Sequence, residues 1–246
     1  MKKNTLALSV SVVLVLALAT SHAQVQRSRS QVELLEVGTF YSGETTAKTG
    51  EEWLGLHVSA HNSQIIPYRL TVRPVEDTVD ERTGKAAMNE VTVDQPLEPL
   101  FLLKDATMLS AGPVLTTFGE DDETSWKHLV AGQPIDLAVG GVAYSLEVIG
   151  SGESPECSDL ELPHNARLVL KSGDKAQTLY SLGWHCGEES SWSLIWAGDL
   201  DRDGKLDLYL SVSPGYSSEK RLFLSSQAGG GRLVREIAVL VKSDGC

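Results

Sequence analysis

The stretch WSLIWAGDLDRDGKLDLYLSV, residues 192–212, carries the pattern that decides the fold. Apolar residues take alternate positions on both sides of an aspartate-rich centre, and they are Trp192, Leu194, Trp196, Leu206, Leu208, Leu210 and Val212. A period of two places such residues on one face of a β-strand. We therefore predict two half-buried strands that are joined by the aspartate-rich loop.

Similar strand patterns recur along the chain, whereas helical patterns are nearly absent. Runs rich in β-branched, leucine and aromatic residues lie at 32–40, 53–60, 65–74, 89–93, 113–118 and 135–149. Gly140-Gly141 in the last run predicts a tight hairpin turn. A second hairpin is predicted between 167–171 and 178–182. The sequence thus predicts an all-β fold, an antiparallel sandwich or a barrel-like structure.

Four consecutive acidic residues, Glu120 to Glu123, interrupt the strand pattern. Because like charges disfavour packing, this run predicts a boundary between an N-terminal β region at 24–120 and a C-terminal β region at 121–246. A single domain with an exposed loop at the acidic run fits the sequence equally well.

The aspartate loop at 199–207 has the spacing of a calcium site. Asp199, Asp201, Asp203 and Asp207 take relative positions 1, 3, 5 and 9, and Gly204 takes position 6. Calcium binds six to eight oxygen ligands, and a glycine at position 6 permits the sharp turn that lets alternate carboxylates converge. Position 7, which offers its backbone carbonyl, is Lys205.

An EF-hand is excluded, because position 12 is Leu210 rather than a bidentate glutamate and a strand pattern follows instead of a helix. The simpler alternative is an acidic turn without an ion. We favour calcium, since four close carboxylates repel one another and a divalent cation relieves that repulsion.

The region of about residues 192–241 resembles a single FG-GAP or VCBS-type repeat, a family of calcium-binding β-propeller repeats. The resemblance rests on the aspartate loop, on the following KRLFL run at 220–224 and on the glycine turn at 229–231. By similarity, the four aspartates would be side-chain ligands and Lys205 a carbonyl ligand. No second D-x-D-x-D-G run occurs, so we expect one such calcium hairpin within another β fold and not a complete propeller.

The first 23 residues are typical of a bacterial secretory signal peptide. Lys2 and Lys3 precede an apolar run from Leu6 to Ala19, and Ser21-His22-Ala23 offers small residues for cleavage after Ala23. The run is shorter than the roughly 20 residues that span a bilayer. We therefore expect an exported protein, in the periplasm or the medium, without a membrane anchor after cleavage.

Three cysteines follow the expected signal peptide, and they are Cys157, Cys186 and Cys246. A disulfide between Cys157 and Cys186 is the first prediction, because the hairpin between them returns its ends to one place. Cys186 to Cys246 is the alternative, and one cysteine stays over in either pairing. Catalysis by Cys186 with His185 is disfavoured, because adjacent strand residues point to opposite faces.

Charge and motif content limit the class of function. The formal charge is −12, and removing residues 1–23 with their two lysines makes it −14, which argues against nucleic-acid binding. No G-x-S-x-G motif occurs, and His57 and His61 lie about 13 Å apart if the stretch is a strand, too far to share a zinc ion. Core packing is the favoured role of the tryptophans, with a sugar-binding face as the alternative.

We thus predict a secreted, non-enzymatic, calcium-binding β protein with a structural, adhesion or ligand-binding role, whose partner would be a carbohydrate or a protein surface. The alternative is a secreted hydrolase with an acidic active site that the sequence does not locate.

Overall fold

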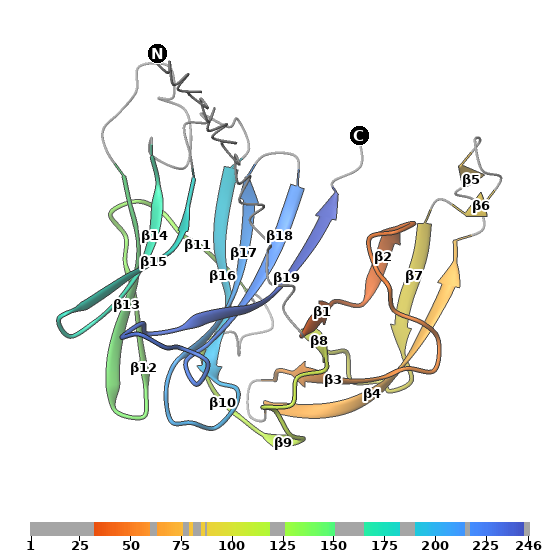
Figure 1. Ribbon diagram of the computed structural model, residues 1–246, viewed down its shortest axis with the longest axis horizontal. Coiled ribbons are helices and arrows are strands. Elements are labelled where there is room, and N and C mark those ends of the chain that lie inside the picture. Colours follow the sequence, from red (N-terminus) through yellow and green to blue (C-terminus); the bar gives the residue numbers. More distant parts are fainter. Residues whose placement is uncertain are drawn as a thin grey trace, which may run out of the picture.

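The computed structural model describes residues 32–59, 63–75, 79–80, 85–86, 88–118, 126–150, 165–182, 190–214 and 217–243. Its regular structure within these ranges consists of strands, arranged in antiparallel sheets that include a curled half-barrel (Figure 1). The all-β prediction is confirmed. These ranges contain no helix that is long and apolar enough to cross a membrane.

The N-terminal part forms a seven-stranded sheet in the order β1-β8-β3-β4-β7-β2, with β9 also on β4. Its strands are β1 (Glu33–Leu35), β2 (Gly38–Tyr41), β3 (Glu52–His57), β4 (Gln64–Pro74), β7 (Met88–Val93), β8 (Phe101–Lys104) and β9 (Gly112–Pro113). The short strands β5 (Val79–Asp80) and β6 (Lys85–Ala86) pair with each other. One predicted strand at 32–40 is two strands, because the chain turns before Gly38 at φ +127° and β1 and β2 join opposite ends of the sheet.

The C-terminal part forms two further sheets. The six-stranded one contains β10 (Leu115–Phe118), β11 (Lys127–His128), β16 (Ser190–Asp199), β17 (Asp207–Pro214), β18 (Ser217–Leu224) and β19 (Arg235–Ser243). The four-stranded one contains β12 (Ile135–Val139), β13 (Val142–Ile149), β14 (Arg167–Ser172) and β15 (Lys175–Ser181). Both predicted hairpins are present, as β12–β13 and β14–β15.

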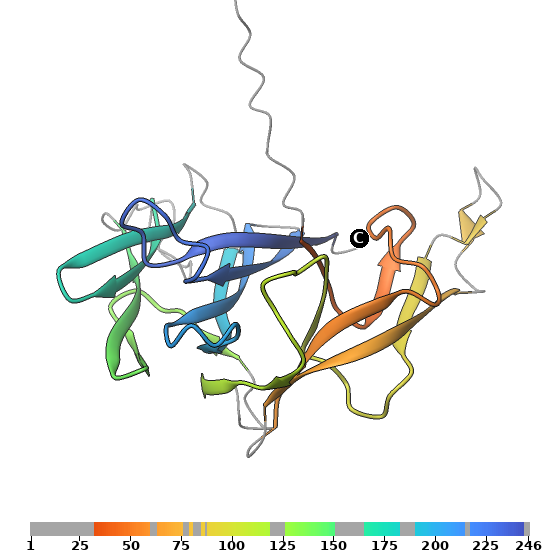
Figure 2. The same cartoon turned by 60° about the horizontal axis from the view of Figure 1, so that its bottom comes forward.

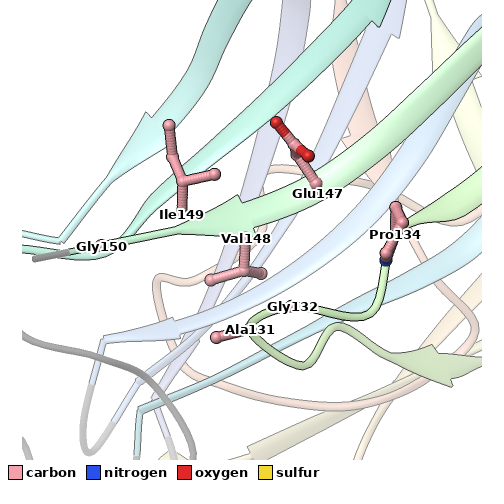
Figure 3. A pocket seen from close by; sticks show the side chains of 7 residues that line it. All are labelled: Ala131, Gly132, Pro134, Glu147, Val148, Ile149 and Gly150. Carbon is pink, nitrogen blue, oxygen red and sulfur yellow. The ribbon is translucent and has the colours of Figure 1, made fainter. Parts of the chain in front are cut away.

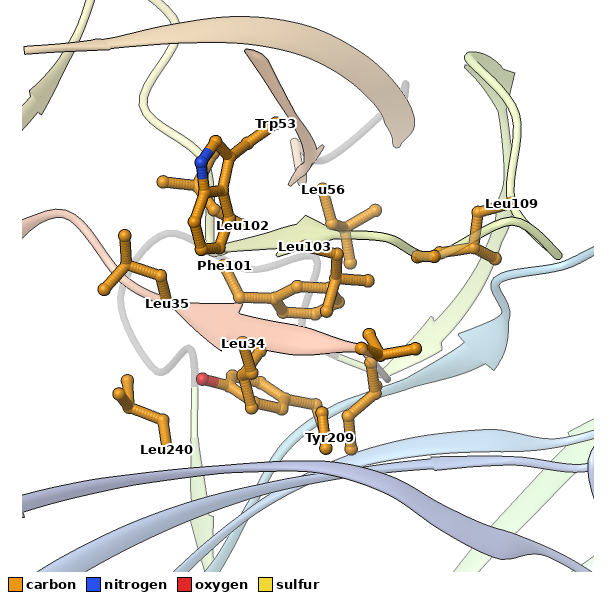
Figure 4. Packing of buried hydrophobic residues seen from close by; sticks show 14 of the residues in the cluster. Leu34, Leu35, Trp53, Leu56, Phe101, Leu102, Leu103, Leu109, Tyr209 and Leu240 are labelled. Atoms are coloured by element: carbon orange, nitrogen blue, oxygen red, sulfur yellow. The ribbon is translucent and has the colours of Figure 1, made fainter. Parts of the chain in front are cut away.

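The six-stranded sheet lies between the other two and is covered on both faces (Figures 1 and 2). One apolar cluster joins it to the seven-stranded sheet, where the rings of Tyr209 and Phe101 lie 4.6 Å apart (Figure 4). A second cluster joins its other face to the four-stranded sheet through residues such as Leu208 and Leu146. Consequently the prediction of half-buried strands is wrong for β16 and β17, in which Asp207 and Tyr209 are as buried as the leucines.

A β-bulge in β16 corrects the predicted side-chain orientation. The register with β17 shifts between Leu194 and Trp196, so Ile195 and Trp196 both join the cluster under the seven-stranded sheet. Trp192 and Leu194 stay in the other cluster. An extra residue in one strand reverses the alternation beyond it, which the period of two in the sequence does not reveal.

The predicted boundary at residue 120 does not coincide with the boundary between the sheets. β10, which precedes the acidic run, already pairs with β16 through Leu115 and Asp199. The seven-stranded and six-stranded sheets also share one apolar cluster. The two-region division stays a prediction.

Replacing Gly140 by alanine should destabilise the fold by more than about 2 kcal/mol. A Cβ at Gly140 would lie 2.2 Å from the carbonyl oxygen of Gly204, which is backbone of the aspartate loop. Gly141→Ala is the matched control, because its φ is also positive, at +77°, but nothing lies within 4 Å of its Cβ position. Thermal unfolding measures both variants. An equal loss in the two would mean that turn strain, rather than this contact, dominates.

Candidate metal centre

The aspartate loop connects β16 and β17 in a tight left-handed turn. Arg202 and Gly204 have φ values of +65° and +79°. The carboxylate of Asp199, the last residue of β16, accepts hydrogen bonds from the backbone N–H of Asp203 at 3.0 Å and of Gly204 at 2.9 Å. These two bonds hold the Asp199 carboxylate against the backbone of the loop.

Three aspartates converge at this turn. Each of Asp199, Asp201 and Asp207 offers one carboxylate oxygen, and these oxygens lie within 4.8 Å of one another. Asp207 is fully buried, and its two oxygens accept hydrogen bonds from the backbone N–H of Leu200 and of Ser225, each at 2.8 Å. The cluster is therefore fixed by backbone donors on two separate segments of the chain.

Two serines that the sequence analysis missed complete the surroundings of the loop. The Ser225 hydroxyl lies 2.9 Å from both carboxylate oxygens of Asp203, and the Ser226 hydroxyl donates to Asp201. Both serines follow β18, which pairs with β17. If the pairing of β17 with β18 is predicted, the residues that follow Leu224 are expected beside the aspartate loop. That pairing is the signal that could have found the two serines.

The charge of the cluster is uncompensated within the described part of the chain. No lysine, arginine or histidine there lies within ion-pair distance of Asp199, Asp201 or Asp207, and the Lys205 ammonium pairs with Asp203 at 3.6 Å. Burial, aided by the charge of Asp201, raises the pKa of Asp207 from 3.8 to about 8. Ionising Asp207 is thus more costly in the fold than in the unfolded chain.

Burial also raises the pKa of Asp201, and the charges of neighbouring aspartates act in the same direction. A divalent cation among the three carboxylates would lower these ionisation costs, because opposite charge favours the ionised form. Convergent carboxylate oxygens suit hard cations such as calcium and magnesium. The donor set therefore fits a metal ion.

The other two predicted ligands lie outside this trio. The Asp203 carboxylate accepts from Ser225 and from the backbone N–H of Lys205 at 2.9 Å, and the Lys205 side chain is exposed. The ligand roles of Asp203 and of the Lys205 carbonyl stay predictions.

No protein-family model, curated protein or solved structure matches this chain. The assignment of the aspartate loop therefore rests on its own geometry and chemistry.

Two other candidate sites have fewer convergent ionisable groups than the aspartate loop. A pocket between the 131–134 turn and β13 presents one carboxylate, that of Glu147, which pairs with Lys171 (Figure 3). The Nδ1 atom of His57 lies 3.1 Å from the carbonyl oxygen of Glu98, and His61 is outside the described residues.

The structure describes two of the tryptophans named above and none of the three cysteines. Trp192 and Trp196 are buried, as expected for core packing, and the indole N–H of Trp196 donates to the Thr116 hydroxyl at 2.9 Å. Trp184, His185, Cys157, Cys186 and Cys246 lie outside the described residues, so the disulfide stays a prediction.

In metal-free protein, the free energy of unfolding should fall as the pH rises from about 4 to about 8, the interval between the ordinary and the native pKa of Asp207. Because the pKa of Asp207 is higher in the native than in the unfolded state, its contribution to stability is complete below the unfolded pKa. This contribution is lost as the pH rises through the native pKa. Denaturant unfolding at several pH values measures the slope. The stability of Asp207→Asn should depend less on pH over this interval, because an amide does not ionise. A slope that persists in the variant belongs to another group.

Proposed function

We propose that this chain is an exported calcium-binding β protein that has a structural or ligand-binding role and no catalytic activity. The observation that carries the proposal is the convergence of Asp199 and Asp201 on the fully buried carboxylate of Asp207. No lysine, arginine or histidine of the described residues pairs with these three groups. Such a site gains stability from an ion and does no evident chemistry of its own.

Calcium is favoured over other ions by the loop itself. The aspartates at positions 1, 3 and 9, with Asp203 at 5 and Gly204 at 6, have the spacing of known calcium loops. Magnesium demands near-octahedral geometry and keeps most of its water, so a carboxylate-rich, tightly wound loop suits calcium better. The resemblance to an FG-GAP or VCBS-type repeat over about residues 192–241 supports the same ion.

A non-enzymatic role is supported by where the acidic groups lie. The hydrolase alternative needs two carboxylates across a cleft, whereas the pocket beside β13 offers only Glu147 among its lining residues. A sugar-binding role through aromatic stacking is disfavoured for Trp192 and Trp196, because both are in the core. The partner, whether a carbohydrate or a protein surface, would have to use other residues.

Calcium should raise the melting temperature of the purified protein, by an amount that corresponds to about 2.7 kcal/mol when the free ion is at 100 times its dissociation constant. The expected dissociation constant is about 10⁻⁴ to 10⁻³ M, as in other extracellular modules. Parallel titrations with magnesium and zinc test the choice of ion. An unchanged melt in calcium and in chelator would remove the proposal.

Asp201→Ala should abolish the calcium-dependent part of that stability and change the melt in chelator little, since burial already makes this carboxylate costly to ionise. Asp136→Ala is the matched control, because Asp136 is an exposed aspartate on β12, and it should leave the calcium response intact. Equal destabilisation by Asp201→Ala with and without calcium would mean that the loop needs the aspartate for its turn alone.

Export and the disulfide are tested by one measurement. Mass spectrometry of the protein recovered from the periplasm or medium should give an N-terminus at Gln24, and non-reducing peptide mapping should link Cys157 to Cys186. An intact N-terminus at Met1 would contradict the signal peptide, and a linked Cys186–Cys246 peptide would support the alternative pairing.

A further inference from the structure

The aspartate loop lies where the chain passes between the two large sheets. β9 ends at Pro113 on the seven-stranded sheet, and β10 begins at Leu115 on the six-stranded sheet. Among the described strands, none before β10 pairs with the C-terminal sheets. Residues 110–115, which we name the crossover, are therefore the covalent junction between the sheets.

Arg202 binds the crossover from the middle of the aspartate loop. Its Nε donates to the carbonyl oxygen of Pro113 at 2.8 Å, and its Nη1 and Nη2 donate to the hydroxyl and carbonyl oxygens of Ser110 at 2.8 and 2.9 Å. No carboxylate in the described residues lies within ion-pair distance of this guanidinium. The side chain is thus engaged in recognising the crossover rather than in neutralising an acid.

The crossover is shaped to receive this contact. Gly112 has a φ of +131°, and a Cβ there would lie 3.2 Å from Nη2 of Arg202. At the next strand, Leu115 pairs with Asp199, and its carbonyl oxygen lies 2.1 Å from the Cβ position of Gly198. The crossover therefore meets the chain at two points, at the end of β16 and at Arg202 in the aspartate loop.

The backbone of Arg202 depends directly on its acidic neighbours. It lies between Asp201 and Asp203 with a φ of +65°, a conformation that residues with a side chain seldom adopt. An ion held by the surrounding carboxylates would fix this backbone and, with it, the direction of the guanidinium. Without the ion, repulsion among the carboxylates opposes the same arrangement.

We propose that the aspartate loop is a calcium-responsive lock on the junction between the two sheets, with Arg202 as its positioning residue. The proposal rests on the calcium site proposed above. Ion binding aligns Arg202 with Ser110 and Pro113 and so stiffens the crossover, and ion release loosens it. Because coupling between two sites is reciprocal, the contact with the crossover also strengthens calcium binding.

The sign of the affinity change separates this lock from simple electrostatics. Removing a positive charge beside an acidic site should strengthen the binding of a cation. Arg202→Gln should instead weaken calcium binding by about fivefold or more, the lower range of allosteric coupling. Lys175→Gln is the matched control, because Lys175 is an exposed lysine on β15 that belongs neither to the aspartate loop nor to the crossover. It should leave calcium binding unchanged.

Isothermal titration calorimetry measures these affinities, and hydrogen exchange measures the lock itself. Calcium should slow exchange in residues 109–118 of the wild type by roughly tenfold, including the Val114 amide that donates to the Ser63 carbonyl oxygen at 2.9 Å. Arg202→Gln should keep calcium-dependent protection of the 199–207 loop and lose that of the crossover. Ser110→Ala, which removes one acceptor, should change both readouts in the same direction but less, and it serves if the arginine variant fails to fold.

The outcomes distinguish the two proposals. If calcium gives neither heat nor altered exchange in the wild-type loop, the calcium site itself is wrong. If calcium binds and protects the loop while exchange in the crossover is unchanged, the site stands and the lock is overturned. Calcium binding by Arg202→Gln that is as tight as in the wild type, or tighter, also overturns the lock.

Discussion

The buried carboxylate of Asp207 connects three segments of the chain at one point. It accepts backbone hydrogen bonds from Leu200 in the loop and from Ser225 after β18, and it faces Asp199 and Asp201. A buried carboxylate is tolerated only where hydrogen bonds and an opposite charge offset its desolvation. The backbone supplies the hydrogen bonds here. No lysine, arginine or histidine among the described residues supplies a positive charge here, and this is the physical reason for proposing a cation at this turn.

The position of this turn gives an ion more than local influence. The six-stranded sheet is covered on both faces, and its aspartate loop meets a different layer on each side. The carbonyl of Gly204 lies against Gly140 in the β12–β13 turn, and Arg202 bonds to Ser110 on the other side. The loop therefore contacts two sheets that are far apart in sequence, which supports the structural role proposed for an ion.

The candidate site was predictable to the extent that it is local. Asp199, Asp201 and Asp207 lie within nine residues, so a tight turn brings them together in any fold that keeps the hairpin. Ser225 and Ser226 reach the same loop only because β18 pairs with β17. The contact between the Ser225 hydroxyl and the Asp203 carboxylate is one that the spacing within the loop does not indicate.

The sequence by itself determined the strands, the hairpins and the acidic loop, because these depend on alternation and turn residues within a few positions. Only the tertiary structure decided which faces are buried. A bulge beside Ile195 moved Trp196 to the opposite face, and the seven-stranded sheet covered Tyr209 on a face that alternation had assigned to solvent. Contacts between distant layers set these outcomes, and a local pattern holds no information about what covers the other side of a sheet.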